Sequence, residues 1–368
     1  AQRWLALAES LTMMNDSQCQ LLPQDDPTCR LADLGESTSN TLGTLCRDQA
    51  VTLKGFAKFK VVDYHEPSDN FITIAPKSNE NMVFHYSATY SPIGQDGNIQ
   101  ILFSAKAFDQ SINIPLHDDD DVDENAVFSS ASQKPSSPCD YYLGDWESVQ
   151  HSNQMQTYLT CGPHLEHLLE PERHYPGITA PYFYFAKDGG TCTPMHIEDA
   201  GLPSVNMVRW GSPKTWLIIE PGSSRRFEEF AASRTLGGKT SGGRRPSHGR
   251  KTCSQFIRHA NILFSQQTLD SWDIKYSIVV CKPGELIVTL PYTYHQVVNL
   301  GMNLAESTNV LWPGIDLQLG SYSFCSKRRC GNRDSSIKET DFAVPIQDDQ
   351  TDLSGTDAQT TARANQIQ

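Results

Sequence analysis

Short runs in which apolar and polar residues alternate recur along the chain and predict β-strands. The runs FAKFKVVDY, NFITIAP, MVFHYSATY and NIQILFSAKAF fall between residues 51 and 116. A second series follows residue 180 and includes SVNMVRW, KTWLIIEPG, YSIVVCKPG and ELIVTLPYTYHQVVNL. Glycine and proline separate the runs, as turns between strands require. So many short strands indicate a mainly β fold, a sandwich or jelly roll, with flanking helices at QTYLTCGPHLEHLLEPE and SSRRFEEFAAS.

Composition divides the chain into four parts. Residues 1–116 form an N-terminal region of uncertain fold that is partly β, and residues 117–140 form an acidic, Ser/Pro-rich linker or loop. Residues 141–330 form a compact domain that carries a basic, glycine-rich insertion at 237–251. The tail, residues 331–368, is polar throughout and is predicted to be disordered.

Charge and cysteine content narrow the function classes. The net charge of −13 disfavours sequence-specific nucleic-acid binding and favours a basic peptide or protein as partner. No apolar run approaches the length of a membrane span, and the first residues lack a signal-peptide pattern. Ten cysteines are too sparse for a disulfide scaffold of 368 residues, so we expect reduced thiols and one metal site formed by cysteines.

The stretch HIED contains a candidate metal centre. His196 and Glu198 are two residues apart and would project from the same face of a strand. His295 ends the strand-like run GELIVTLPYTYH, and two histidines with one carboxylate form the facial triad of non-haem Fe(II) oxygenases. Since the chain has eleven histidines, ordinary histidines beside a solvated glutamate are the alternative.

Lys214 is a lone cation in the apolar run WGSPKTWLII. Burying it is costly unless it is paired. An iron centre of this type needs a cation for the distal carboxylate of 2-oxoglutarate, and Lys214 on a neighbouring strand could supply it. The alternative is a lysine whose ammonium reaches solvent at a strand edge.

Two blocks, PYFYF…MHIEDAGLPSVNMVRWGSPKTW and CKPGELIVTLPYTYHQVVNLGMNLAESTN, resemble the JmjC domain of histone lysine demethylases. The similarity runs from about Gly177 to Cys330 and is greatest to the branch that acts on trimethylated lysines of histone H3. It implies a cupin-like double-stranded β-helix in residues 141–330, Fe(II) and 2-oxoglutarate as cofactor and co-substrate, and nuclear localisation.

The resemblance also assigns roles by position. It implies iron ligands at His196, Glu198 and His295, and 2-oxoglutarate contacts at Lys214, Asn206, Ser204 and Trp216. It implies a methyl-lysine pocket lined by Gly177, Tyr184, Glu198, Ser307 and Asn309. A trimethylammonium has no N–H to donate, so oxygen atoms and an aromatic ring suit it. Gly177 lets a backbone carbonyl approach the substrate closely.

Four further residues form a candidate zinc site. Cys253, His259, Cys325 and Cys330 make a Cys3His set of the kind that binds structural zinc. The family pattern places the last cysteine two residues after Cys325, where this chain has Lys327. Cys330 would substitute if the loop bulges; four unrelated side chains are the alternative.

The chain also departs from the family pattern. Thr193 occupies the position of an aromatic residue that packs on 2-oxoglutarate, and the tyrosine that pairs with Lys214 has two candidates, Tyr141 and Tyr142. We find no JmjN segment and no PHD, Tudor or zinc-finger reader module in the sequence.

The sequence thus favours an Fe(II)/2-oxoglutarate-dependent dioxygenase that demethylates histone H3 lysines, of the lysine 9 or lysine 36 type, with release of formaldehyde and succinate. Its partners would be dioxygen and a methylated histone tail or another basic peptide, which an acidic run at 118–121 could attract. A JmjC protein hydroxylase and an inactive chromatin-associated scaffold are the alternatives.

Overall fold

The computed structural model describes residues 28–29, 46, 49–65, 71–76, 83–93, 97–115, 139–150, 157–170, 173, 175–235, 253–315, 317–326, 330 and 337–343. The segment 117–138, the insertion 237–251 and the early run RWLALAESLTMM lie outside these residues. Among the described residues, no helix is both long and apolar enough to cross a membrane.

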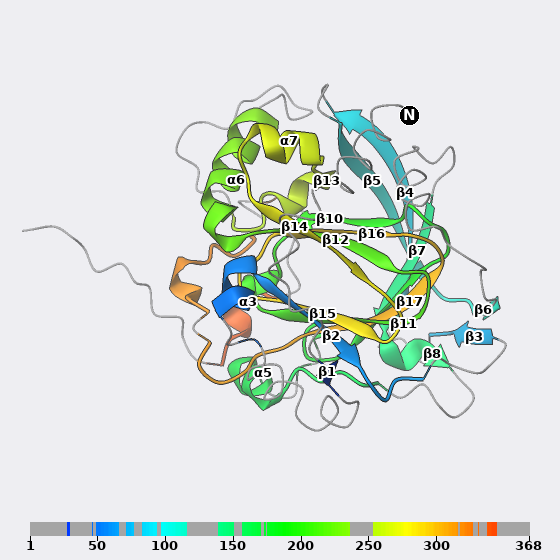
Figure 1. Cartoon of the computed structure of the whole chain (residues 1–368). Helices are drawn as coiled ribbons and strands as arrows, with labels where there is room; N and C mark the ends of the chain where they lie inside the picture. Colours follow the sequence, from blue (N-terminus) through cyan, green and yellow to red (C-terminus); the bar gives the residue numbers. More distant parts are fainter. Residues whose placement is uncertain are drawn as a thin grey trace, which may run out of the picture.

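Two β-sheets face each other and form the centre of the molecule (Figure 1). The larger sheet has the strand order β1-β2-β15-β11-β17-β9-β7-β4-β5-β13, and the smaller has β10-β16-β12-β14. From β9 to β17 the chain passes repeatedly from one sheet to the other, and every pairing among these strands is antiparallel. The predicted mainly β fold is therefore confirmed, in the arrangement of a double-stranded β-helix.

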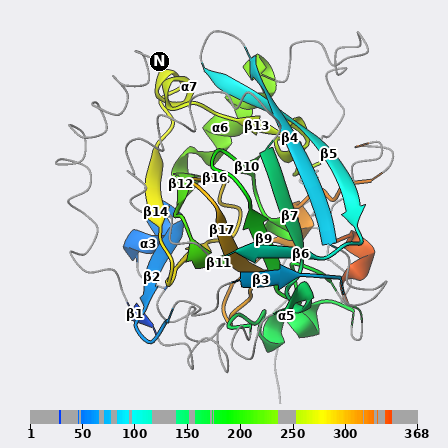
Figure 2. The same cartoon turned by 90° about the vertical axis from the view of Figure 1, so that its right-hand side faces the viewer.

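The strands of the larger sheet are β1 (Thr28–Cys29), β2 (Phe56–Val61), β4 (Val83–Ile93), β5 (Asn98–Phe108), β7 (Cys139–Asp145), β9 (Tyr182–Ala186), β11 (Ser204–Gly211), β13 (Ile262–Leu263), β15 (Glu285–Thr289) and β17 (Asn303–Asn309). Those of the smaller sheet are β10 (Cys192–His196), β12 (Lys214–Ile219), β14 (Tyr276–Cys281) and β16 (His295–Asn299). A third sheet, of order β6-β3-β8, contains β3 (Phe71–Ile74), β6 (Ile112–Pro115) and β8 (Val149–Gln150). It lies at the right-hand edge of the molecule in Figure 1, and its strands β3 and β6 face the viewer in Figure 2.

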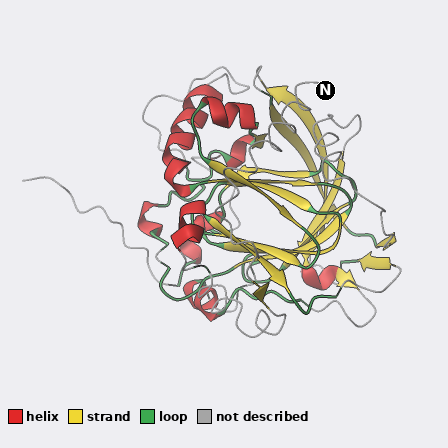
Figure 3. Ribbon diagram, in the orientation of Figure 1, coloured by secondary structure: helices red, strands yellow, loops and turns green. Residues whose placement is uncertain are grey.

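Helices cover the outer face of the smaller sheet (Figure 3). Phe227 of α6 and Trp272 beside α7 pack in one apolar core with Leu217 and Ile219 of β12. The α-helices are α3 (Gln49–Lys54), α5 (Pro163–Leu168), α6 (Ser224–Phe230) and α7 (Gln266–Ser271), and a π-turn, Ala231–Thr235, extends α6. The short 3-10 turns are η2 (Trp146–Ser148), η3 (Asp199–Gly201), η4 (Pro221–Ser223), η6 (Arg258–Ala260), η7 (Leu319–Ser321) and η8 (Glu339–Asp341).

An apolar layer fills one part of the space between the two sheets. Val208 and Ile287 of the larger sheet pack there with Trp216, Ile218 and Val297 of the smaller sheet. Residues opposite each other on paired strands point to the same side, so this layer fixes which alternate residues face inward. The polar side chains on these same inward faces form the candidate site.

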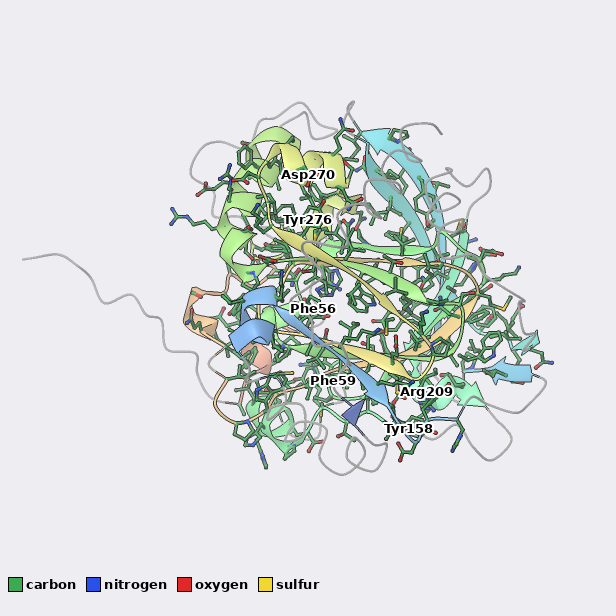
Figure 4. All side chains as sticks on the ribbon, in the orientation of Figure 1. Phe56, Phe59, Tyr158, Arg209, Asp270 and Tyr276 are labelled. Atoms are coloured by element: carbon green, nitrogen blue, oxygen red, sulfur yellow. The ribbon has the colours of Figure 1, made fainter. Side chains whose placement is uncertain are left out.

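A buried ion pair lies on the opposite face of the larger sheet. Arg209 of β11 pairs with Glu306 of β17, and both side chains are almost fully buried. The guanidinium stacks 3.8 Å from the ring centroid of Tyr158 (Figure 4), and Glu306 also accepts hydrogen bonds from the backbone N–H groups of Tyr158 and Leu159. These contacts tie the segment 157–159 to the barrel wall.

The larger sheet contains strands from both sides of the predicted linker, residues 117–140. β2, β4 and β5, which precede it, pair with β15, β7 and β13. The N-terminal strands are thus part of the barrel wall.

The prediction of a wholly disordered tail was wrong for residues 337–343. They contain the turn η8, and Phe342 forms a β-bridge with Leu169. Ile337 is fully buried, and Arg173 binds the buried carboxylate of Asp341 at 2.5 Å. Two apolar residues of this segment, Ile337 and Phe342, thus pack in the core.

Candidate active site

Three candidate metal ligands meet inside the barrel at one end of the smaller sheet. His196 is the last residue of β10 and His295 the first of β16, and the two are paired in register. Glu198 lies beyond the end of β10 but keeps an extended backbone (φ −66°, ψ 156°), so the expected alternation survives. Its Oε1 lies 3.9 Å from His196 Nε2 and 3.6 Å from His295 Nε2. These distances suit three ligands around one ion.

Backbone carbonyls hold both imidazoles in one tautomer. His196 Nδ1 donates to the carbonyl of Pro194 at 2.8 Å, and His295 Nδ1 to that of Thr293 at 3.0 Å. Each Nε2 therefore keeps its lone pair toward the cluster, as metal-binding histidines require. Burial, and then the neighbouring His295, lower the pKa of His196 to about 3, so this imidazole is neutral at physiological pH.

Glu198 supplies the only carboxylate in this three-residue group. Burial alone would raise its pKa, but the adjacent imidazoles of His295 and His196 outweigh burial and lower the pKa below its ordinary value. A carboxylate with two imidazoles matches the facial set that binds Fe(II) and leaves coordination positions for other ligands.

Lys214 places a positive charge in the same interior. It begins β12, its side chain is 2% exposed, and burial lowers its pKa to about 8. Among the residues that the structure describes, no carboxylate forms an ion pair with it; Tyr184 is a neighbour, with its ring centroid 5.7 Å from Nζ. An ammonium in this situation is stabilised by an anion that enters the site.

Several buried polar atoms have no hydrogen-bond partner in the described part of the chain, and two of them belong to the set implied for 2-oxoglutarate. They are Asn206 Oδ1 on β11 and Trp216 Nε1 on β12. The centroid of the Trp216 ring lies 5.5 Å from that of the His295 ring. Ser204, the other member, instead bonds Thr289 through the two hydroxyls at 2.7 Å. Such orphaned groups fit a site that a polar ligand completes.

The structure separates the two candidate tyrosines. Tyr141 is buried on the inward face of β7, where its ring lies 6.0 Å from that of Tyr184 and its hydroxyl neighbours Thr193 and Asn299. Tyr142 points to the other side and stacks on His85. Asn299 pairs in register with Lys214, so Tyr141 belongs to the neighbourhood of the buried ammonium.

Three of the residues implied for a methyl-lysine pocket, Tyr184, Ser307 and Asn309, share the inward face of the larger sheet. Ser307 and Asn309 of β17 lie opposite Asn206 and Ser204 of β11. Their side chains donate hydrogen bonds to the carbonyls of Val205 and Pro203. These hydrogen bonds fix the side chains of Ser307 and Asn309 on the inward face of the larger sheet, beside the inward residues of β11.

Tyr184 and Gly177 continue this wall. Tyr184 lies near Glu198, and burial, followed by that carboxylate, raises the pKa of its hydroxyl, which stays protonated. Gly177 has φ +76°, and a Cβ there would lie 3.0 Å from the ring of Tyr182. Any side chain at 177 would therefore be strained and crowded.

Comparison with known proteins agrees with this geometry. Residues 183–310 match the family model described as "JmjC domain, hydroxylase". This segment is similar to a JmjC domain. Both histidines, Glu198 and Lys214 lie inside the matched segment, whereas Gly177, Tyr141 and the candidate zinc ligands Cys325 and Cys330 lie outside it.

Three curated relatives align over the JmjC region. Lysine-specific demethylase 4B of Mus musculus is 36% identical over 133 residues, which is 36% of this chain and 11% of that protein. Lysine-specific demethylase 4D of Rattus norvegicus is 34% identical over 137 residues, or 37% of this chain and 24% of that protein. Probable lysine-specific demethylase 4F of Homo sapiens is 35% identical over 137 residues, or 37% and 20%. The chain therefore matches less than a quarter of each relative's length.

A second cluster of ligands lies beside the JmjC centre. The ligand atoms of Cys253, His259, Cys325 and Cys330 all lie within 4.8 Å of one another, and His259 Nε2 is 3.2 Å from Cys325 Sγ. The structure thus brings Cys330 to the cluster although its spacing departs from the family pattern. The hydrogen bond from Cys325 lowers the pKa of the Cys253 thiol to about 4, so one thiolate is already favoured before a metal binds.

Gln255, which belongs to this neighbourhood, was not predicted from the sequence. Gln255 lies between two zinc-type ligands in CSQFIRH, and its amide reaches the backbone beside Glu198. A buried glutamine has no motif of its own, and only the fold shows which carbonyls it meets.

Proposed function

We propose that this JmjC protein is an Fe(II)- and 2-oxoglutarate-dependent histone lysine demethylase of the type that acts on lysine 9 or lysine 36 of histone H3. The observation that carries the proposal is that a His-Glu-His centre and the uncompensated ammonium of Lys214 share one barrel interior. Similarity to three lysine-specific demethylases supports the choice of reaction.

The residues present fit both groups. His196, Glu198 and His295 would hold iron, because each histidine already directs Nε2 toward the cluster. Lys214 would bind the distal carboxylate of 2-oxoglutarate, and the hydroxyl of Tyr141 is the neighbouring donor. With both groups bound, the centre supplies dioxygen-dependent oxidation of an N-methyl group, which is released as formaldehyde while 2-oxoglutarate is converted to succinate and carbon dioxide.

The protein's own contribution is to orient the substrate and exclude water. Tyr184 would present its ring and un-ionised hydroxyl to a methylated ammonium, and Ser307 and Asn309 would present fixed polar atoms. C–H groups beside a positive nitrogen are polarised and favour oxygen atoms and aromatic faces. A free amine would instead seek strong acceptors for its N–H groups.

Thr193 changes one wall of the co-substrate site. An aromatic ring stands at this position in the branch that the chain resembles, whereas Thr193 adds a small hydroxyl next to that of Tyr141. We infer that polar contacts replace ring packing against the co-substrate. Lys214 and the orphaned atoms of Asn206 and Trp216 argue against an inactive scaffold, which would have no need to bury them.

The zinc-type cluster and the cell compartment complete the proposal. Zn(II) at Cys253, His259, Cys325 and Cys330 would be structural, since three thiols and an imidazole fill a tetrahedral shell. A methylated histone tail as substrate places the protein in the nucleus.

The test is formaldehyde release from histone H3 peptides trimethylated at lysine 9 or at lysine 36. Mass spectrometry of the same peptides would record loss of methyl groups. An unmethylated peptide and the Glu198→Ala variant are the controls. Product that gains oxygen and keeps all its carbon, without formaldehyde, would identify a protein hydroxylase instead.

A further inference from the structure

Glu198 needs a support that its strand does not provide. β10 ends at His196, and Glu198 caps the short turn η3, in which Ala200 has φ +56°. A left-handed alanine is unfavourable and persists where its surroundings hold the backbone in place. The two histidines have carbonyl partners within their own strands or turns, whereas this glutamate sits on a turn.

The side-chain amide of Gln255 holds that turn. Its Nε2 lies 3.2 Å from the carbonyl oxygen of Ile197 and 3.0 Å from that of Glu198. The same nitrogen lies 3.4 Å from Asp199 Oδ1 and 2.9 Å from the Tyr322 hydroxyl. Gln255 is 1% exposed, so water does not compete for these contacts.

Gln255 belongs to the segment that carries two of the zinc-type ligands. Cys253 lies two residues before it, and the N–H of His259 donates to the Gln255 carbonyl at 3.0 Å. Ser254 and Ser323 exchange two hydrogen bonds, of 2.8 and 2.9 Å, which join this segment to the one that bears Cys325. The position of the Gln255 amide is therefore set by the folding of the cysteine cluster.

We propose that Gln255 is a positioning residue through which the Cys/His metal cluster fixes the Glu198 ligand of the His-Glu-His centre. The inference rests on the proposed iron centre. A bound Zn(II) would hold the turn 253–259, the Gln255 amide would hold the carbonyls of residues 197 and 198, and Glu198 would then face the two imidazoles. Occupancy of one metal site thus raises the affinity of the other, and by linkage the effect is reciprocal.

Arg258 provides a second, weaker support in the same direction. Its Nη1 lies 3.1 Å from Asp199 Oδ1, so the residue after Glu198 is held from the same turn. Because the Arg258 side chain is 41% exposed, solvent screens this pair and Gln255 carries most of the coupling.

The test measures Co(II) binding to the His-Glu-His centre in protein that retains zinc and lacks iron. Visible d–d absorption follows the centre, and a thiolate charge-transfer band would reveal cobalt that enters the cysteine cluster. Gln255→Met keeps the length of the side chain and removes the amide. We expect the dissociation constant for Co(II) to rise about tenfold, the lower range for loss of an outer partner of a metal ligand. Zinc content stays unchanged.

Further variants keep the result decisive. Gln255→Asn shortens the side chain and withdraws the amide from the carbonyls, so it serves if Gln255→Met destabilises the fold. Asn98→Leu removes another buried amide, whose Oδ1 accepts from Ser265 N at 2.9 Å, and should bind Co(II) like the wild type. Removal of zinc should weaken Co(II) binding in the wild type and add little in the Gln255 variants.

Unchanged Co(II) affinity in folded, zinc-loaded Gln255 variants would overturn the inference. So would an equal effect of zinc removal in wild type and variants. Failure of the proposed iron centre gives a different result, in which wild type and His196→Ala bind Co(II) alike.

Discussion

The two ligand clusters of this protein are built in opposite ways. His196 and His295 come from paired strands of a barrel, and each is fixed by a backbone carbonyl close in sequence. The cysteine cluster draws its ligands from turns and loops far apart in the sequence, and its thiols hydrogen-bond to one another. The His-Glu-His centre provides three nitrogen and oxygen donors, which would leave coordination positions of Fe(II) for other ligands. The cysteine cluster provides four donors, three of them sulfur, which would fill the tetrahedral coordination of zinc. We propose that the centre built on the strands carries the chemistry and that the cysteine cluster organises the loops around it.

Loss of a proposed iron ligand tests the His-Glu-His centre most severely. His196→Ala leaves two ligands, and we expect demethylation to fall by more than roughly 100-fold, since loss of outer partners alone costs 10- to 100-fold. His85→Ala is the matched control, because His85 also meets a carboxylate, Asp140, at 2.9 Å, but the pair belongs to no group of three ligands among the described residues. Formaldehyde release measures both. Equal activities of the two variants would contradict the assignment of His196 as a metal ligand.

Loss of a cysteine ligand should act on stability before chemistry. Cys253→Ser removes the favoured thiolate, and we expect a cost above about 4 kcal/mol, the range for loss of a structural metal. This corresponds to roughly 10 °C in Tm, measured by calorimetry. Cys281→Ser, a buried cysteine outside the cluster, is the control. A variant with native Tm and zinc content would show that the cluster does not hold metal.

Lys214→Met sharpens the contrast by leaving both clusters intact. Methionine fills the space but cannot hold a carboxylate, and loss of one partner of a buried pair costs about 3 kcal/mol, or roughly 100-fold. We expect this increase in the KM for 2-oxoglutarate, with Fe(II) affinity and Tm little changed. A normal KM would mean that another group anchors the co-substrate.

Tyr141→Phe should have a smaller effect on the same quantity. The loss of one hydrogen bond to a charged group costs about 1.5–3 kcal/mol, so the KM for 2-oxoglutarate should rise about tenfold or more. Tyr142→Phe is the matched control, because that ring stacks on His85 at 4.6 Å on the other side of the strand. The assignment of Tyr141 fails if both variants behave alike.

The smallest expected effect is on pH dependence. Burial lowers the pKa of Lys214 to about 8, so the ammonium is charged below this pH and loses its proton above it. Capture of anionic 2-oxoglutarate, measured as kcat/KM, should therefore decline above about pH 8, by up to tenfold per pH unit. In Lys214→Arg, which stays charged, this decline should disappear. A decline that persists would belong to another group.

Much of this architecture could be predicted from the sequence, because successive side chains of a strand point to opposite faces and residues two apart share a face. Runs of apolar residues between Gly and Pro turns predicted β11, β12, β14, β15 and β16. The spacing of His196 and Glu198 held even though Glu198 lies beyond the strand, because its backbone stays extended. The choice between Tyr141 and Tyr142 needed the strand pairing, since adjacent residues point to opposite faces.

Other features depend on contacts between distant segments. No sequence pattern in the polar tail predicts that Ile337 and Phe342 pack in the core. Cys330 joins its cluster although its spacing from Cys325 departs from the family pattern. Gln255 supports Glu198 across 57 residues, a relation that no local motif contains.

The most direct measurement of the central claim is an anaerobic titration of the protein with Fe(II) and 2-oxoglutarate, following the visible metal-to-ligand charge-transfer band. The band should appear in the wild type, be lost in His196→Ala, and require much more 2-oxoglutarate in Lys214→Met. A wild-type protein that binds Fe(II) but gives no band on addition of 2-oxoglutarate would contradict the claim that His196, Glu198, His295 and Lys214 form one oxygenase site.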